Sequence, residues 1–298
     1  TAHHELSSAR ASSLGRPSRM SVAKEILWYL EGHLSGDLSL DTVADAVGIS
    51  RFHASRVFVL ATGSSVSDYA RARRLSEAAK ALAAGASDIL SIALQAGYGS
   101  HEAFTRAFRQ RFGITPEQLR ARADTNHLAL QEPMTMNLQA TENKLEPPRI
   151  TQHPALLVFG LGRRYGGDAS IAAIPSQWDR FLPHWRHIQG QVGDTTYGVC
   201  CNTDDTGSFE YITGVEVKEF PAEPQEFSRL RIPPQKYAVF QHRGHVSTVH
   251  GTWTAIWDHG LRDASLQAAD GPGFERYDGA QFDSKTGTGG LEIWVPVR

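Results

Sequence analysis

Two stretches of the chain carry side chains that could read DNA bases, at the spacing of one helix face. In the first stretch, the positions i, i+3, i+4 and i+7 are Phe52, Ser55, Arg56 and Val59. In the second stretch, they are Glu102, Thr105, Arg106 and Arg109. Arginine can donate two hydrogen bonds to one guanine, serine and threonine can bond to several bases, and an apolar ring can contact the thymine methyl group. The chemistry expected of both stretches is therefore sequence-dependent contact with double-stranded DNA.

The two stretches belong to an internal repeat with an offset of fifty residues. Under this offset Ser50 returns as Ser100, Arg56 as Arg106, Phe58 as Phe108 and Gly63 as Gly113. A single surface arginine is usually only solvated, so neither arginine alone would indicate a DNA contact. A repeated unit, however, indicates one physical task performed twice.

Helices must position these residues, and the apolar spacing predicts seven of them between Ser21 and Ala123. Short helices flank the turns at residues 48–50 and 97–100, where glycine precedes a capping serine, as is typical of a helix-turn-helix. A long helix over about residues 65–84 links the two units. Two recognition helices held in this way could enter successive major grooves, about 34 Å apart.

The second unit resembles the AraC/XylS signature over residues 92–116. The matching positions are Ala93, Gly97, Tyr98, Phe104, Arg106, Phe108, Phe112, Gly113 and Pro116. The resemblance implies DNA contacts from Phe52, Ser55 and Arg56 in the first recognition helix. From the second, it implies contacts from His101, Glu102, Thr105 and Arg106. Among the clustered basic residues, Arg71, Arg74 and Arg109 are expected on phosphates.

A different chemistry is possible at Glu292, which lies within the apolar terminal stretch 291–297. Strand alternation places Glu292 and Trp294 on one face, with Leu291 and Ile293 on the other. If that face lines a pocket, a carboxylate beside aromatic rings would attract a cationic, apolar molecule. The alternative is that Glu292 points to solvent from a sheet with one wet face.

The C-terminal half has the pattern of a duplication in which each copy runs strand, helix, strand, strand. Strands are expected at 155–161, 196–201 and 211–218, and again at 236–242, 274–277 and 291–297. The helices are expected at 178–188 and 252–263. We therefore predict an α+β domain with a mostly antiparallel sheet, both helices on one side, and a cleft suited to a small ligand.

This half resembles the GyrI-like small-molecule-binding domain over most of residues 149–298. The resemblance rests on the stretches 236–244, 252–257, 274–278 and 291–297. It implies an effector site with an acidic residue on the last strand and aromatic walls. We assign these roles to Glu292 and to Tyr237, Trp257, Tyr277 and Trp294. Aromatic residues also fill ordinary cores, so a core role is the alternative for each.

The predicted organisation has four parts. Residues 1–20 are read as a leader or an added segment before a natural start at Met20, and 21–124 as the AraC-type DNA-binding domain. Residues 125–148 form a linker in which Leu128, Leu130 and Leu138 could dock on a domain, and 149–298 form the GyrI-like domain. This domain order resembles that of Rob-like regulators.

Composition excludes several other classes. The two cysteines are adjacent, which fits a reduced cytoplasmic protein without a disulfide framework. No apolar run approaches membrane-spanning length. Neither a phosphate loop nor metal-ligand spacing occurs, since His242, His245 and His250 lack a fixed pattern, so no cofactor or metal is expected.

The leading interpretation is a transcriptional regulator, not an enzyme, that responds to a small and lipophilic, cationic effector. RNA polymerase is a further candidate partner, and activation is one candidate outcome. Two alternatives stay open at this point. The C-terminal half could hydrolyse a reactive lipophilic compound, with Glu292 as general base, or it could bind another protein.

Overall fold

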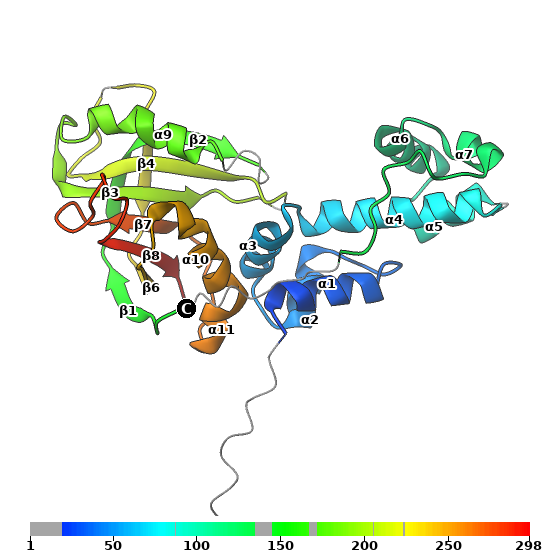
Figure 1. The fold of residues 1–298 in the computed structure, drawn as a ribbon, viewed down its shortest axis with the longest axis horizontal. Helices are drawn as coiled ribbons and strands as arrows, with labels where there is room; N and C mark the ends of the chain where they lie inside the picture. Colours follow the sequence, from blue (N-terminus) through cyan, green and yellow to red (C-terminus); the bar gives the residue numbers. More distant parts are fainter. Residues whose placement is uncertain (1–19, 87, 135–144, 167–171, 205, 223) are drawn as a thin grey trace, which may run out of the picture.

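A computed structural model describes residues 20–86, 88–134, 145–166, 172–204, 206–222 and 224–298. The predicted leader, apart from Met20, and the docking role of Leu138 lie outside these residues. The N-terminal half is helical and the C-terminal half is built on one sheet, as the sequence predicted (Figure 1). No helix in the described ranges has the length and apolar character needed to cross a membrane.

The seven helices expected in the N-terminal half are present. They are α1 (Val22–Gly32), α2 (Leu40–Val47), α3 (Arg51–Thr62), α4 (Val66–Ala83), α5 (Ile89–Gln95), α6 (His101–Phe112) and α7 (Pro116–Arg122). Serine, aspartate or threonine caps every N-terminus, and α7 has a full capping box between Thr115 and Gln118. Both α3 and α6 end at a left-handed glycine, Gly63 and Gly113, with φ of 69° and 76°.

The two helix-turn-helix units have separate cores. In the second unit, Phe104 and Phe108 pack with Leu75 and Leu119, and the predicted linker residues Leu128 and Leu130 pack against this cluster. The helix α4 projects away from the sheet and carries α5, α6 and α7 at its far end (Figure 1). The core of the first unit is continuous with that of the C-terminal half.

The C-terminal half forms an eight-stranded antiparallel sheet with the order β1-β6-β8-β7-β3-β4-β2-β5. Its first copy comprises β1 (Arg149–His153), β2 (Leu156–Tyr165), α9 (Ile174–Phe181), β3 (Gln191–Cys201) and β4 (Phe209–Val217). Its second copy comprises β5 (Ser228–Ile232), β6 (Gln235–His242), α10 (Val249–Ala255), β7 (Gly273–Tyr277) and β8 (Leu291–Pro296). The two copies exchange their first strands. In this exchange β1 of the first copy pairs with β6 of the second, and β5 of the second copy pairs with β2 of the first.

The structure adds two strands that were not expected and corrects the bounds of two expected helices. The strands β1 and β5 were missed because they are short, polar edge strands without an apolar run. The helix expected at 178–188 begins earlier, at Ile174, and gives way to a 3₁₀ turn at Leu182–His184, where Pro183 cannot donate a helical hydrogen bond. The helix expected at 252–263 starts at Val249 and continues through a π-helical turn, Ile256–Gly260, into α11 (Leu261–Asp263).

Strand register decides which side chains share a face of the sheet. Ile293 pairs with Phe240 and with Glu275, and Phe240 and Ile293 pack under Trp253 and Ile256 of the helical segment that starts with α10. Glu275 pairs in turn with Gly198. The face that carries Glu275 is therefore the face covered by the helices.

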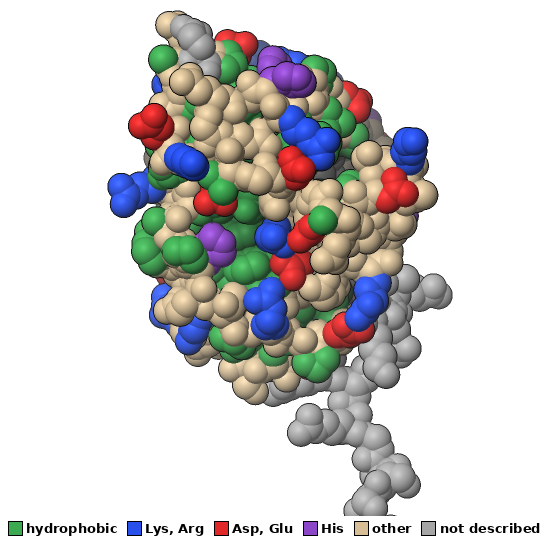
Figure 2. All heavy atoms as spheres, turned by 90° about the vertical axis from the view of Figure 1, so that its left-hand side faces the viewer, with side chains coloured by type: hydrophobic (Ala, Val, Ile, Leu, Met, Phe, Trp, Pro, Cys, Tyr) green, Lys and Arg blue, Asp and Glu red, His purple; other side chains and the backbone are tan. Residues whose placement is uncertain are grey.

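On the opposite face, the curvature of the sheet brings distant strands together. One buried cluster there joins Val158 of β2 to Tyr237 of β6 and Trp294 of β8, although four strands separate β2 from β6. Figure 2 shows the surface of this half on the side turned away from α4, where hydrophobic side chains gather in the middle and charged side chains surround them.

Candidate functional site

The second recognition helix, α6, presents an exposed polar face. Ser100 caps it by accepting a hydrogen bond from the Ala103 N–H at 3.2 Å. Glu102, Arg106 and Arg109 are exposed, and His101 contacts Glu117 with 3.0 Å between Nε2 and Oε1. Thr105 is half-buried, and its Oγ1 has no hydrogen-bond partner among the described residues. The charged end groups of this face are open to a ligand as large as DNA.

Of the three arginines expected on phosphates, the two on α4 have different surroundings. Arg71 is exposed, with a loose contact of 3.9 Å to Asp68. Arg74 is half-buried, and its guanidinium donates to the carbonyls of Leu34, at 2.6 Å, and Gly36. It also lies against Gly97 in the turn of the second unit. Arg74 therefore links the two units, and only Arg71 of this pair extends into solvent.

The first recognition helix, α3, has the corresponding face covered. Ser55 is 6% exposed and Arg56 is 9% exposed. Phe52 packs edge-on against Trp257, with 5.5 Å between ring centroids. Val59 is buried, and Gly207 approaches it so closely that a Cβ at Gly207 would overlap its side chain. Trp257 and Gly207, which cover this face of α3, belong to the C-terminal half.

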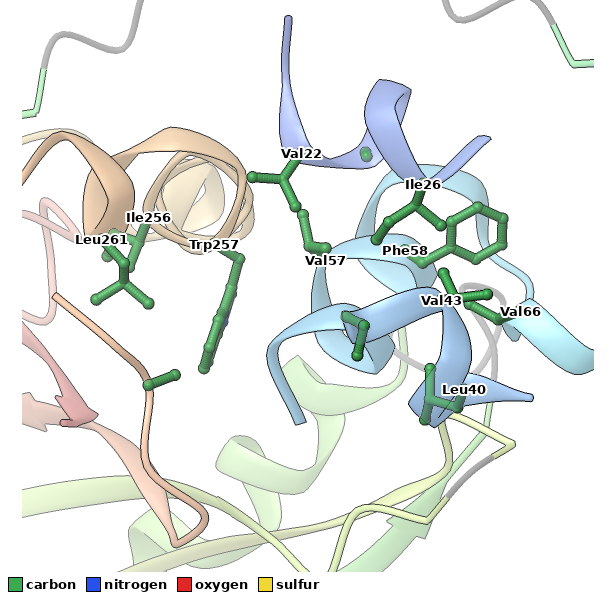
Figure 3. Packing of buried hydrophobic residues seen from close by; sticks show 14 of the residues in the cluster. Val22, Ile26, Leu40, Val43, Val57, Phe58, Val66, Ile256, Trp257 and Leu261 are labelled. Carbon is green, nitrogen blue, oxygen red and sulfur yellow. The ribbon is translucent and has the colours of Figure 1, made fainter. Parts of the chain in front are cut away.

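A continuous apolar core joins α1 and α3 to the helical segment after α10. Figure 3 shows Val22 and Val57 on the side of the first unit that faces Ile256 and Trp257, and all four are buried. Because this core crosses between the halves, separating them would expose large apolar side chains to water.

Polar contacts fix the same interface. Arg262 donates two hydrogen bonds to the Glu25 carboxylate, at 2.7 and 2.8 Å. The Ala23 N–H, at the start of α1, donates to Asp258 at 3.2 Å. His53 bonds through Nε2 to the Trp257 carbonyl, and burial lowers the pKa of this histidine. The neutral imidazole is therefore the form that fits the interface.

A cavity of about 580 Å³ lies between α9, α10, the covered face of the sheet and α3. Aromatic side chains supply much of its lining: Trp178, Phe209, Tyr211, Trp253, Trp257, Tyr277 and Phe282. Ser55, Arg56, Val59 and Leu60 of α3 line it as well. Its volume falls in the range of about 300–1,000 Å³ typical of small-molecule sites.

A buried carboxylate, Glu275, lies in this cavity and is 5% exposed. Trp253 Nε1–H donates to its Oε1 at 2.8 Å, and the hydroxyls of Tyr211 and Tyr277 both donate to its Oε2 at 2.8 Å. Gly198 makes room for this group, because a Cβ there would overlap the Tyr211 hydroxyl. Burial raises the pKa of Glu275, and the three donors oppose that rise by stabilising the anion.

A buried guanidinium also lies in the cavity. Arg56 lies over the rings of Phe52 and Phe209, with Cζ 5.6 and 5.1 Å from their centroids. Its Nε has no hydrogen-bond partner among the described residues. The Cys200 thiol lies within electrostatic reach of both Arg56 and Glu275, and burial raises its pKa to about 11.

The predicted effector residues divide between the two faces of the sheet. Trp257 and Tyr277 line the cavity. Glu292 contacts Arg149, Gln241 and the Trp294 indole N–H, at 3.1, 2.8 and 3.0 Å, on the opposite face. Tyr237 and Trp294 pack together on that face, with 5.7 Å between centroids. The structure does not bring these three residues into the cavity, because alternation along β8 turns Ile293, not Glu292, toward the helices.

Sequence reasoning missed Glu275 although it lies in the stretch 274–278 used for the resemblance. Alternation around this residue placed one charged side chain on each face of β7, Glu275 on one and Arg276 on the other. A charged residue on each face of a central strand is a sequence signal that one of the two charges is buried. Choosing between the faces requires the strand order, which fixes the side that the helices cover.

A double helix-turn-helix unit joined to a second domain with a ligand-sized cavity is the arrangement of a DNA-binding transcriptional regulator with an attached α+β domain. Comparison with known proteins supports this class. Residues 146–298 match the family described as the GyrI-like small molecule binding domain, and residues 43–122 match a helix-turn-helix domain family.

Three relatives illustrate the similarity. The right origin-binding protein of Escherichia coli K12 is 41% identical over 291 residues, covering 93% of this chain and 98% of that protein. The transcriptional regulator Rob of Salmonella typhimurium is 27% identical, with the same coverage. The transcriptional activator AarP of Providencia stuartii is 38% identical over 115 residues, covering 38% of this chain and 84% of that protein. The chain belongs to the Rob-like transcriptional regulators, with an AraC-type helix-turn-helix domain before a GyrI-like domain.

Proposed function

We propose that this protein is a sequence-specific, DNA-binding transcriptional regulator whose C-terminal domain binds a small lipophilic cation. The regulator class and the helix-turn-helix domain follow from the family. The observation that carries the effector proposal is the buried Glu275 carboxylate within an aromatic cavity of about 580 Å³.

The proposed DNA contacts come first from α6. Arg106 is exposed there and suits bidentate bonding to guanine, and Arg109 and Arg71 are exposed cations suited to phosphates. Glu102 can accept from the cytosine amino group, which would add sequence preference. The His101 side chain contacts Glu117 in the structure and would have to give up this contact to bind DNA.

The proposed effector chemistry follows from charge and shape. A carboxylate removed from water is costly unless it is hydrogen-bonded or paired with a cation. Glu275 has three donors, and aromatic faces beside it attract cations through their quadrupoles. A bulky cation with apolar substituents would supply the paired charge and fill the aromatic lining in one step.

A thermal-shift comparison of two charge-opposed isosteres tests this assignment. Tetraphenylphosphonium and tetraphenylborate have the same shape and opposite charge. We expect the cation to raise the melting temperature of the wild-type chain far more than the anion does. We expect Glu275→Gln to abolish the difference, since its amide retains the shape but not the charge.

Glu292→Gln is the matched control, and it also tests the residue that the sequence favoured. It removes one carboxylate from the opposite face of the same sheet. Cation selectivity that survives Glu292→Gln and is lost in Glu275→Gln supports the cavity. The reverse pattern would support the original prediction and contradict the cavity as the site.

A further inference from the structure

The cavity is closed on one side by the helix that should read DNA. Ser55 and Arg56 are the residues expected on bases, yet both line the proposed effector site. One face of α3 therefore has two possible partners, the sensor cavity and a DNA groove. It cannot contact both at once, because a covered side chain cannot reach a base edge.

Arg56 occupies the cavity as a cation. It is 9% exposed, lies over Phe209, and shares the lining with Glu275. Aromatic faces and a carboxylate are the groups that a cationic effector would also need. The guanidinium lies over ring faces and interacts with the Cys200 thiol, and its Nε lacks a hydrogen-bond partner among the described residues. A buried donor without an acceptor weakens the closed arrangement.

We propose that Arg56 is an internal occupant of the cation site, which an effector cation displaces, releasing α3 for DNA. The proposal rests on the proposed function and names how that site is regulated. Two like charges in one cavity of low polarity repel each other, so effector and Arg56 disfavour each other's presence. Binding of the effector and exposure of α3 are then linked, and DNA and effector must strengthen each other's binding by the same factor.

The first test is the affinity of the full chain for tetraphenylphosphonium by titration calorimetry, without DNA. We expect Arg56→Met to bind this cation about tenfold more tightly than wild type, since a competing charge is gone. Arg51→Met is the matched control. It removes a cation from the same helix at an exposed position paired with Asp41, at 2.9 Å, and should leave the affinity unchanged.

Tetraphenylborate separates charge competition from simple opening of the cavity. A gain in Arg56→Met that is confined to the cation supports the proposal. A gain shared equally by the anion would mean that the mouth only widened, and it would overturn charge competition. Equal cation affinity in wild type and Arg56→Met would overturn the proposal while leaving the Glu275 site intact. Absence of cation binding to either chain would overturn the proposed effector function together with it.

The second test is the reciprocal linkage in the wild-type chain. A duplex selected by this protein from a random pool would serve as the DNA. We expect tetraphenylphosphonium to raise the affinity for this duplex, and the duplex to raise the cation affinity by an equal factor. Cation binding that leaves the DNA affinity unchanged, or lowers it, would contradict release of α3.

Discussion

The helices α3 and α6 are copies of one unit in the sequence and face opposite surroundings in the structure. Arg56 and Arg106 are equivalent by the repeat, yet Arg56 is 9% exposed inside a cavity and Arg106 is exposed. The difference arises outside the repeat. Among the described residues, the core of the C-terminal half continues into the first unit, and the core of the second unit includes no residue of that half. A repeated motif therefore indicates that both helices carry side chains suited to the same contacts. The surroundings of each helix decide whether those side chains are accessible.

The two units also differ in whether they share a core with the C-terminal half. The second unit has its own core, and no described residue of the C-terminal half belongs to it. The first unit shares its core with the C-terminal half, so a change in that half can reach α3 directly. Under the proposed regulation, α6 would supply the constant part of DNA binding and α3 the regulated part.

The largest expected effect is at the centre of the shared core. Trp257→Ala removes a buried ring that contacts Phe52 and His53, with centroids at 5.5 and 5.3 Å. We expect a loss of about 3–5 kcal/mol in the free energy of unfolding, measured by urea denaturation. Trp28→Ala, at a position 70% exposed on α1, is the control and should change this free energy by less than about 0.5 kcal/mol. A loss in Trp257→Ala as small as that in Trp28→Ala would show that the interface contributes little to the free energy of unfolding.

The next effect sharpens the comparison between the equivalent arginines. Arg106→Ala should cost about 1–3 kcal/mol on a specific duplex and relax the base preference, because the side chain is open to DNA. Without effector, Arg56→Ala should cost less, since its side chain lies in the cavity. Binding measured on the selected duplex and on scrambled duplexes checks both. Equal losses would contradict the difference in accessibility, and a loss equal on all sequences would assign Arg106 to phosphate alone.

The smallest effect is the dependence of the interface on pH. Burial lowers the pKa of His53, and Arg262 adds to this while the Trp257 carbonyl and Asp258 oppose it. In the unfolded chain the pKa returns to about 6.5, so that state binds the proton more readily. The stabilisation is complete above this value and decreases as pH falls toward the lowered pKa of the folded state. Urea denaturation across this range should show a shallower decline in His53→Gln, and identical slopes would exclude His53 as the group responsible.

Much of the fold follows from the sequence because its signals are local. Capping serines, left-handed glycines and apolar spacing identify α1–α7, and alternation identifies the central strands. The edge strands β1 and β5 were not predicted, because their pairing with β6 and β2 makes them strands and their composition does not indicate a strand. Their detection requires knowledge of how the two copies exchange strands.

The candidate site was harder to predict for the same reason. Trp257 and Tyr277 were named, yet Glu275 was not, because only strand order tells which face of β7 the helices cover. The covering of α3 depends on contacts with distant residues, such as Phe209 against Arg56 and Trp257 against Phe52. No local pattern around α3 reports such a contact.

The central claim is that α3 is covered by the C-terminal domain while α6 is open, and thiol accessibility tests it most directly. Val59 and Arg109 are equivalent by the repeat; Val59 is 8% exposed and Arg109 is exposed. Val59→Cys and Arg109→Cys would each be treated with a maleimide on a polymer too bulky to enter the cavity. We expect Val59→Cys to react at least about tenfold more slowly without effector, because reaction requires local undocking. Equal rates at the two positions would contradict the account.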